Sequence, residues 1–195
     1  MLQAGLHNLR QASVRITEVS PRDGLQHESE FVPTLRKISL INALSRTGVT
    51  EIEAGSFVSP AAIPQLADSD EVLRAIDRIP GVTYSALVPN ERGLERARAA
   101  GVDKIAVFTA ASNSFTRHNI KATVQESLVR FRPIVAAAKR DGMAVRAYLS
   151  TVVFCPYEGR IAPTQVRDVM ERLLDLAVDD ISLGETVGKA SPTDI

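Results

Sequence analysis

The regular alternation of short β-branched runs with amphipathic stretches is the feature that most constrains the fold of this chain. Six strand-like segments are separated by helical ones along residues 14–183. The expected strands are 14–19, 50–54, 82–88, 104–108, 144–153 and 180–183, and the expected helices are 33–46, 69–79, 90–100, 122–140 and 163–177. Strands that alternate with helices form right-handed βαβ units, so the sequence predicts a mainly parallel sheet.

Two α/β architectures fit this alternation, a doubly wound open sheet and a closed TIM (β/α)8 barrel. Neither G-x-G-x-x-G nor G-x-x-x-x-G-K-[ST], the phosphate-binding turns of many open sheets, occurs in the sequence. Polar residues instead follow one expected strand after another, and a barrel collects such residues on its C-terminal face. A complete barrel needs about 250 residues. We therefore expect an N-terminal lead at 1–13 and an incomplete TIM barrel of about six βα units at 14–195.

The end of the sequence supports the expectation of an incomplete barrel. Ser191 and Pro192 form a helix-opening pattern, with a serine N-cap followed by proline in the first turn, yet the sequence stops at Ile195. The sequence is thus expected to be truncated. Loss of the last strands should leave two open sheet edges and an uncovered apolar interior.

Composition bounds the classes of function. The net charge is zero and the basic residues are scattered, which argues against nucleic acid or a membrane surface as a partner. No apolar run approaches the roughly 20 residues that cross a bilayer. A single cysteine excludes an internal disulfide and favours a reducing compartment, so a cytoplasmic location is expected.

The loop after the first expected strand has the strongest chemical signal. Arg22 and Asp23 stand where a barrel strand would end, and Gly24 allows the backbone to turn sharply. An aspartate there can bind a hard divalent cation through oxygen, and the arginine can hold an anionic oxygen. Taken alone, however, an Arg-Asp-Gly tripeptide is also typical of a solvated turn.

Four segments together resemble one family. Residues 18–26, EVSPRDGLQ, are similar to the opening signature of the metal-dependent barrel superfamily that includes isopropylmalate, homocitrate and citramalate synthases. Residues 52–60 (IEAGSFVSP), 155–159 (CPYEG) and 181–188 (ISLGETVG) narrow the resemblance to hydroxymethylglutaryl-CoA lyases. The similarity extends in register from about Val14 to the last residue.

This resemblance implies a retro-Claisen cleavage of 3-hydroxy-3-methylglutaryl-CoA into acetoacetate and acetyl-CoA. The family reaction uses a divalent cation, Mg or Mn, and an acyl-CoA substrate. Asp23 is then a metal ligand, and Arg22 is the catalytic cation that stabilises the enolate and contacts substrate. Glu53 supports the catalytic site at the end of the second strand, and Gln26 lines the substrate pocket.

Three further positions are candidates of a less direct kind. Glu185 matches a position that is usually aspartate in the family, and we expect it to support the groups that bind metal and substrate or to handle protons. Its side chain is longer by one methylene, which matters where placement counts. Tyr148 and Ser150 end the fifth expected strand and are expected to face substrate, although a core tyrosine fits the pattern equally well. The segment 110–119 resembles a substrate-facing loop.

The cysteine and the histidines of this sequence are expected to have no catalytic or metal-binding role. Cys155 has no base near it in sequence, so a structural or loop thiol is expected. His7, His27 and His118 lack metal-ligand spacing and are expected at the surface. The family's remaining metal ligands, a His-x-His pair and an asparagine, do not occur in this sequence, so the chain alone is expected to bind its cation weakly and to show little lyase activity.

Two other functions remain open. A Claisen-type synthase of the same superfamily, joining acetyl-CoA to a 2-oxo acid, shares the Arg-Asp-Gly loop and the barrel. A non-catalytic remnant or interaction protein is the alternative from a different class. The sequence leaves the exact acyl-CoA and the oligomeric state undetermined, a homo-oligomer being compatible with it.

Overall fold

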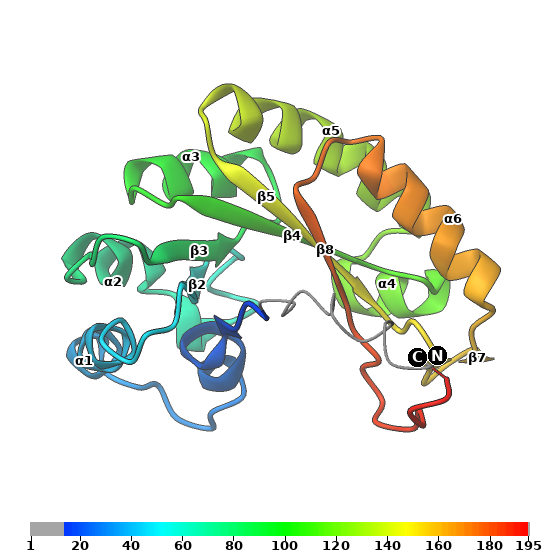
Figure 1. The fold of residues 1–195 in the computed structure, drawn as a ribbon, viewed down its shortest axis with the longest axis horizontal. Coiled ribbons are helices and arrows are strands. Elements are labelled where there is room, and N and C mark those ends of the chain that lie inside the picture. The colour runs from blue at the N-terminus through cyan, green and yellow to red at the C-terminus, as the bar shows by residue number, and fades with distance from the viewer. Residues whose placement is uncertain (1–13, 195) are drawn as a thin grey trace, which may run out of the picture.

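The computed structural model describes residues 14–194, and its central feature is a strongly curved parallel sheet with helices along the outer side (Figure 1). The sheet strands are β1 (Thr17–Glu18), β2 (Glu51–Ser56), β3 (Thr83–Leu87), β4 (Lys104–Ala110), β5 (Ala144–Ser150) and β8 (Asp180–Leu183). The α-helices are α1 (Thr34–Leu44), α2 (Ser69–Ala75), α3 (Glu91–Ala99), α4 (Asn113–Ile120), α5 (Val124–Arg140) and α6 (Pro163–Leu174). The expected alternation of strand and helix is confirmed.

The order of the strands distinguishes a barrel from a doubly wound sheet. In space the order is β1-β2-β3-β4-β5-β8, which is the order along the chain, and each neighbouring pair is parallel. A doubly wound sheet reverses its order at a switch point. This sheet does not, so the helices all return on one side and the sheet curls as an incomplete barrel, as predicted. Its two edges are β1 and β8.

The two faces of the sheet differ in chemistry because successive side chains of a strand point to opposite sides. The outer face packs apolar residues such as Ile52, Ile105 and Val145 against the helices, and all three are fully buried. The alternate positions carry polar residues, among them Glu53 and Lys104, which are also buried. The expectation of an uncovered apolar interior is therefore wrong, since the inner face is mainly polar.

Helix ends follow the local sequence. Thr123 caps α5 by accepting the N–H of Glu126, whose carboxylate returns to the backbone of Thr123 at 2.7 Å, a complete capping box. Asn90 caps α3 through the N–H of Gly93 at 2.8 Å. Gly48 follows α1 with φ +93°, a backbone conformation that disfavours other residues.

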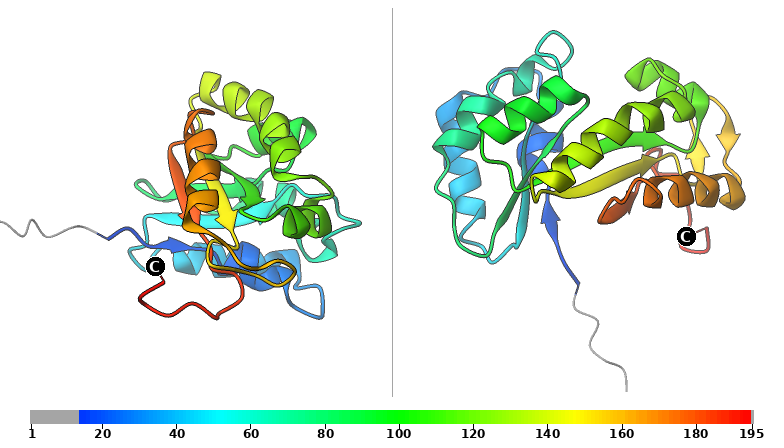
Figure 2. Two further views of the ribbon diagram at one scale, coloured as in Figure 1. Left: turned by 90° about the vertical axis from the view of Figure 1, so that its right-hand side faces the viewer. Right: turned by 90° about the horizontal axis from the view of Figure 1, so that it is seen from above.

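Four segments differ from the sequence expectation. The helix expected at 69–79 ends at Ala75, because Ile76 turns to an extended backbone conformation. The strand expected at 14–19 is reduced to two residues because it lies at an edge and pairs with β2 alone. The expected loop at 110–119 contains α4, which Ser112 starts by accepting the N–H of Phe115 at 3.0 Å. The strand expected at 144–153 ends at Ser150, and the chain continues into an unexpected antiparallel hairpin, β6 (Phe154–Cys155) and β7 (Gly159–Arg160), which lies beside α4 (Figure 2).

A β-bulge in β2 sits beside the inner-face residue Glu53. The register with β3 shifts between Glu53 and Gly55, and bulges redirect side chains near active sites. Gly55 has no room for a side chain, since a Cβ there would lie 2.8 Å from Ser69 Oγ. That hydroxyl is fixed, because it accepts the N–H of Ser56 at 3.0 Å and donates to Leu66 O at 2.8 Å.

Replacing Gly55 by alanine is therefore expected to lower the free energy of unfolding by about 1–3 kcal/mol. Urea denaturation of Gly55→Ala, Ser69→Ala and the double variant measures this. The double variant should lose less stability than the sum of the single variants, because removing Oγ relieves part of the overlap. Strict additivity would contradict the steric explanation.

Candidate active site

Arg22 is brought to the inner face by a single π-helical turn, Ser20–Gly24, that follows β1 directly. The carbonyl of Val19 accepts the N–H groups of Arg22 and Asp23 at 3.0 and 2.7 Å, which tightens the turn. Pro21 is buried and anchors it. The side chain of Arg22 is consequently 11% exposed, and it points toward the strands rather than into solvent.

Glu53 is the centre of the polar contacts at this position. Arg22 Nε donates to Glu53 Oε1, and Tyr148 OH donates to Glu53 Oε2, so one fully buried carboxylate joins the end of β1 to β5. The guanidinium carbon of Arg22 lies 5.5 Å from the centre of the Tyr148 ring. Arg22 Nη1 also donates to Asp23 Oδ1 at 2.6 Å. The structure thus brings together four residues from three separate segments of the sequence, and we call them the Glu53 cluster.

The contacts within this cluster determine the protonation states of Arg22 and Tyr148. Burial alone would lower the pKa of Arg22, but the carboxylates of Glu53 and Asp23 outweigh it and raise that pKa, so the guanidinium stays charged. Burial raises the pKa of Tyr148, and the adjacent Glu53 carboxylate raises it further. Tyr148 therefore stays a neutral hydrogen-bond donor, and the site presents a fixed cation beside a fixed O–H dipole.

The carboxylate of Asp23 is suited to an external cation, since its side chain is 51% exposed and only one oxygen is paired with Arg22. It is a single ligand, however. Within residues 14–194 no three His, Cys, Asp or Glu side chains are grouped so that they would hold a metal ion. A divalent cation at Asp23 fits the donor chemistry, but it needs further ligands that the described residues do not provide.

The other sequence candidates lie around this cluster without bonding to it. Gln26 is half-buried, and its Oε1 is shielded from solvent but accepts no hydrogen bond from residues 14–194. Ser150 ends β5 and is half-buried. Glu185 follows β8, where its Oε2 accepts the N–H groups of Gly188 and Lys189. The Glu185 carboxylate thus caps its own loop.

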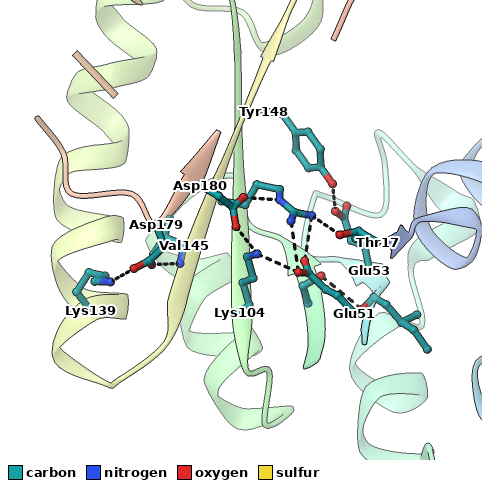
Figure 3. A network of polar contacts seen from close by, with 12 residues as sticks. Thr17, Glu51, Glu53, Lys104, Lys139, Val145, Tyr148, Asp179 and Asp180 are labelled. Atoms are coloured by element: carbon teal, nitrogen blue, oxygen red, sulfur yellow. Dashed lines mark hydrogen bonds and ion pairs between the residues drawn. The ribbon is translucent and has the colours of Figure 1, made fainter. Parts of the chain in front are cut away.

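A second set of ionic contacts, which the sequence reasoning missed, lies on the same inner face. We call Glu51, Lys104, Arg146 and Asp180 the charge layer (Figure 3). Lys104 Nζ lies 3.1 Å from Glu51 Oε2 and 2.5 Å from Asp180 Oδ2. The signal for it was the period of two in the strands, where charged residues alternate with apolar ones.

An open cleft of about 650 Å³ runs between the two edge strands. Thr17 and Val19 line it from the β1 side, while Arg146, Tyr148 and Asp180 line it from β5 and β8. The charge layer and the Glu53 cluster therefore share one concave surface, as expected for the inside of a barrel.

Cys155 lies in the β6–β7 hairpin, away from the Glu53 cluster. Its buried thiol contacts Ser112 Oγ at 3.0 Å and accepts the N–H of Tyr157 at 3.4 Å. No base contacts it among residues 14–194, which agrees with a structural thiol. His27 and His118 are exposed as expected, and His7 lies outside the described residues.

A parallel sheet in chain order, with polar side chains gathered on its inner face, places this protein in the class of TIM-barrel folds, here as an incomplete barrel. The HMGL-like family model matches residues 13–195, and the chain belongs to the HMGL-like family. It is 49% identical over 179 residues to the mitochondrial hydroxymethylglutaryl-CoA lyase of Bos taurus, covering 92% of this chain and 55% of that protein. The chain thus spans about half the length of that curated relative.

Solved structures give the same result. The HMG-CoA lyase of Brucella melitensis superposes with a TM-score of 0.91 at 51% identity, over 93% of this chain and 64% of the other. An HMG-CoA lyase of Acinetobacter baumannii, solved with coenzyme A and 3-methylmalate, superposes with a TM-score of 0.88 at 39% identity, over 92% and 59% of the two chains. The resemblance to this family and the incomplete TIM barrel are confirmed. No helix among residues 14–194 is both long and apolar enough to span a membrane.

Proposed function

We propose that this chain provides the part of a hydroxymethylglutaryl-CoA lyase active site that polarises the substrate. The observation that supports the proposal is the Glu53 carboxylate, which fixes both the Arg22 guanidinium and the Tyr148 hydroxyl on the inner face of the barrel. The substrate is an acyl-CoA, and the proposed reaction is the cleavage of 3-hydroxy-3-methylglutaryl-CoA. A cytoplasmic location is proposed as well, on the single buried free thiol.

The reaction removes the proton of the tertiary hydroxyl and breaks the adjacent carbon–carbon bond. The electron pair of that bond moves to the thioester carbonyl, giving the enolate of acetyl-CoA, which is then protonated on carbon. Arg22 Nη2 donates no hydrogen bond to any residue of 14–194 and is free to meet the enolate oxygen. A guanidinium fixed before the reaction stabilises that charge without reorganising. Tyr148 and Ser150 are proposed to contact substrate, and Gln26 to line the pocket.

A divalent cation, Mg or Mn, is proposed at Asp23, where as a Lewis acid it would favour loss of the hydroxyl proton. Proton handling is assigned to Glu185. This role requires the carboxylate to leave the N–H groups of Gly188 and Lys189, which it caps in the described structure.

A chimera tests the function. This chain, joined to the part of the Bos taurus lyase beyond its matched region, is expected to convert 3-hydroxy-3-methylglutaryl-CoA to acetoacetate and acetyl-CoA when Mg or Mn is present. The chain alone is expected to turn over far more slowly, because Asp23 is the one metal ligand that it is proposed to provide. Robust turnover by the unaided chain would show that the site is misplaced. A properly folded chimera without turnover would contradict the proposed function.

The competing synthase reaction is separated by its products. A Claisen-type synthase would release free CoA from acetyl-CoA and a 2-oxo acid, and the chimera can be given both substrates with a thiol reagent present. We expect no CoA release above background. Release that depends on the 2-oxo acid would favour the synthase.

A further inference from the structure

The charge layer lies beneath the Glu53 cluster, and the two share strands β2 and β5. Glu51 precedes Glu53 by two residues on β2, and Arg146 precedes Tyr148 by two on β5. Two residues along a strand correspond to about 6.6 Å and return the side chain to the same face. β2 and β5 therefore each present one residue to the charge layer and the next inward residue to the candidate site.

Arg146 crosses the interior of the curved sheet. From β5, its Nε donates to Asp180 Oδ1 on β8 at 2.6 Å, and its Nη1 lies 2.9 Å from Glu51 Oε1 on β2. Nη1 also donates to Thr17 Oγ1 on β1 at 3.2 Å. In the sheet, β5 is separated from β2 by β3 and β4. Backbone hydrogen bonds join neighbouring strands alone, so the direct contacts between β2 and β5 across the interior are made by side chains.

The contact of Tyr148 with Glu53 spans the same two strands one layer higher. Because Glu51 and Glu53 share β2, and Arg146 and Tyr148 share β5, we expect a change in the β2–β5 separation at the charge layer to reach the Tyr148–Glu53 contact. We propose that Arg146 is a positioning residue for the proposed lyase site, acting as a strut that fixes the Tyr148–Glu53 contact. This inference rests on the proposed function, because Arg146 is said to position groups of the lyase site. The contacts that support it can be tested without measuring turnover.

Burial and charge favour a strut over a substrate-binding role. The side chain of Arg146 is 12% exposed, and those of Lys104 and Glu51 are 4% and 3% exposed. Two cations face two carboxylates, so the charge layer is balanced by itself. Burial would lower the pKa of Arg146, but its bond to Asp180 and the nearby Glu51 raise it instead, so the strut stays charged.

Replacing all three tyrosines by 3-fluorotyrosine provides a test that needs no catalysis. The fluorine lowers the phenol pKa, and 19F NMR follows each tyrosine, with Tyr148 assigned by Tyr148→Phe. In Arg146→Gln we expect the pKa of Tyr148 to fall by about one pH unit, because loosening its contact with the Glu53 carboxylate removes a cause that raises it.

The direction of the change in the pKa of Tyr148 distinguishes a positioning role of Arg146 from a direct effect of its charge. Arg146 itself lowers the pKa of Tyr148, as Arg22 does, so removing Arg146 from an unchanged site would raise that pKa. An unchanged or raised pKa in Arg146→Gln would therefore overturn the proposal. A lyase assay that fails while the pKa falls would instead count against the proposed function alone.

Two further variants complete the experiment. Arg167→Gln removes a 65% exposed arginine on α6 and should leave the Tyr148 signal unchanged, as a matched control. If Arg146→Gln does not fold, Thr17→Val decides the question, since it removes one anchor of the strut without changing any charge. A smaller fall in the pKa of Tyr148 is expected in Thr17→Val, and no change there would overturn the proposal.

Discussion

Replacing Glu53 by alanine is expected to lower the free energy of unfolding by about 3–5 kcal/mol, the usual cost of removing one partner from a buried ion pair. The carboxylate is fully buried, and its loss leaves the Arg22 guanidinium without its main counter-charge and the Tyr148 hydroxyl without an acceptor. Equilibrium unfolding in urea, monitored by far-UV circular dichroism, measures the change.

Controls distinguish this cost from a general effect of losing a glutamate. Glu95→Ala on the exposed side of α3 should change the stability by no more than about 0.5 kcal/mol. The double variant Glu53→Leu with Arg22→Met removes both charges and should recover much of the loss, because an apolar pair replaces an ion pair without leaving a buried charge. Equal losses in Glu53→Ala and Glu95→Ala would show that the Glu53 cluster is not a stabilising unit.

Replacing Arg22 by glutamine in the chimera is expected to lower kcat by about 10²–10³-fold, the typical loss when one preorganised donor to a developing oxyanion is removed. The guanidinium is held charged and oriented by Glu53 and Asp23, so glutamine supplies neither its charge nor its remaining N–H groups. Steady-state assays over a range of 3-hydroxy-3-methylglutaryl-CoA concentrations separate kcat from KM.

Two further variants serve as comparisons for Arg22→Gln. Arg22→Lys keeps a charge but lacks the planar fork that bonds Glu53 and Asp23 together, so its kcat should lie between those of the parent and Arg22→Gln. Arg167→Gln should match the parent. Retention of kcat in a folded Arg22→Gln variant would remove Arg22 from the reaction.

The sequence by itself determined the architecture because that information is local and periodic. The sixth strand is predicted with its correct bounds, 180–183, and the bounds of α1 and α3 are predicted to within a few residues. The reason is that the spacing of apolar residues and the glycines that end helices can be read directly from the sequence. The polar composition of segment 110–119 indicates a loop and conceals the Ser112 cap that begins α4. The strand expected at 14–19 is present as β1 but is only two residues long, because edge strands extend only as far as a neighbour pairs with them.

The candidate residues were found in part by resemblance and in part by position after a strand. Arg22, Asp23 and Glu53 were identified from motifs, and the structure shows the three in contact, with Tyr148 joining them. Glu185 was placed after the correct strand, but its carboxylate caps its own loop instead of reaching this cluster.

Only the tertiary structure decided how distant charges meet. Glu51 and Arg146 are 95 residues apart, and Lys104 and Asp180 are 76 residues apart, yet each pair is in contact inside the curved sheet. A period of two shows which residues share a face of a strand, but not which strands approach across the interior. That approach depends on the curvature of the whole sheet, which arises from the packing of every helix and strand together.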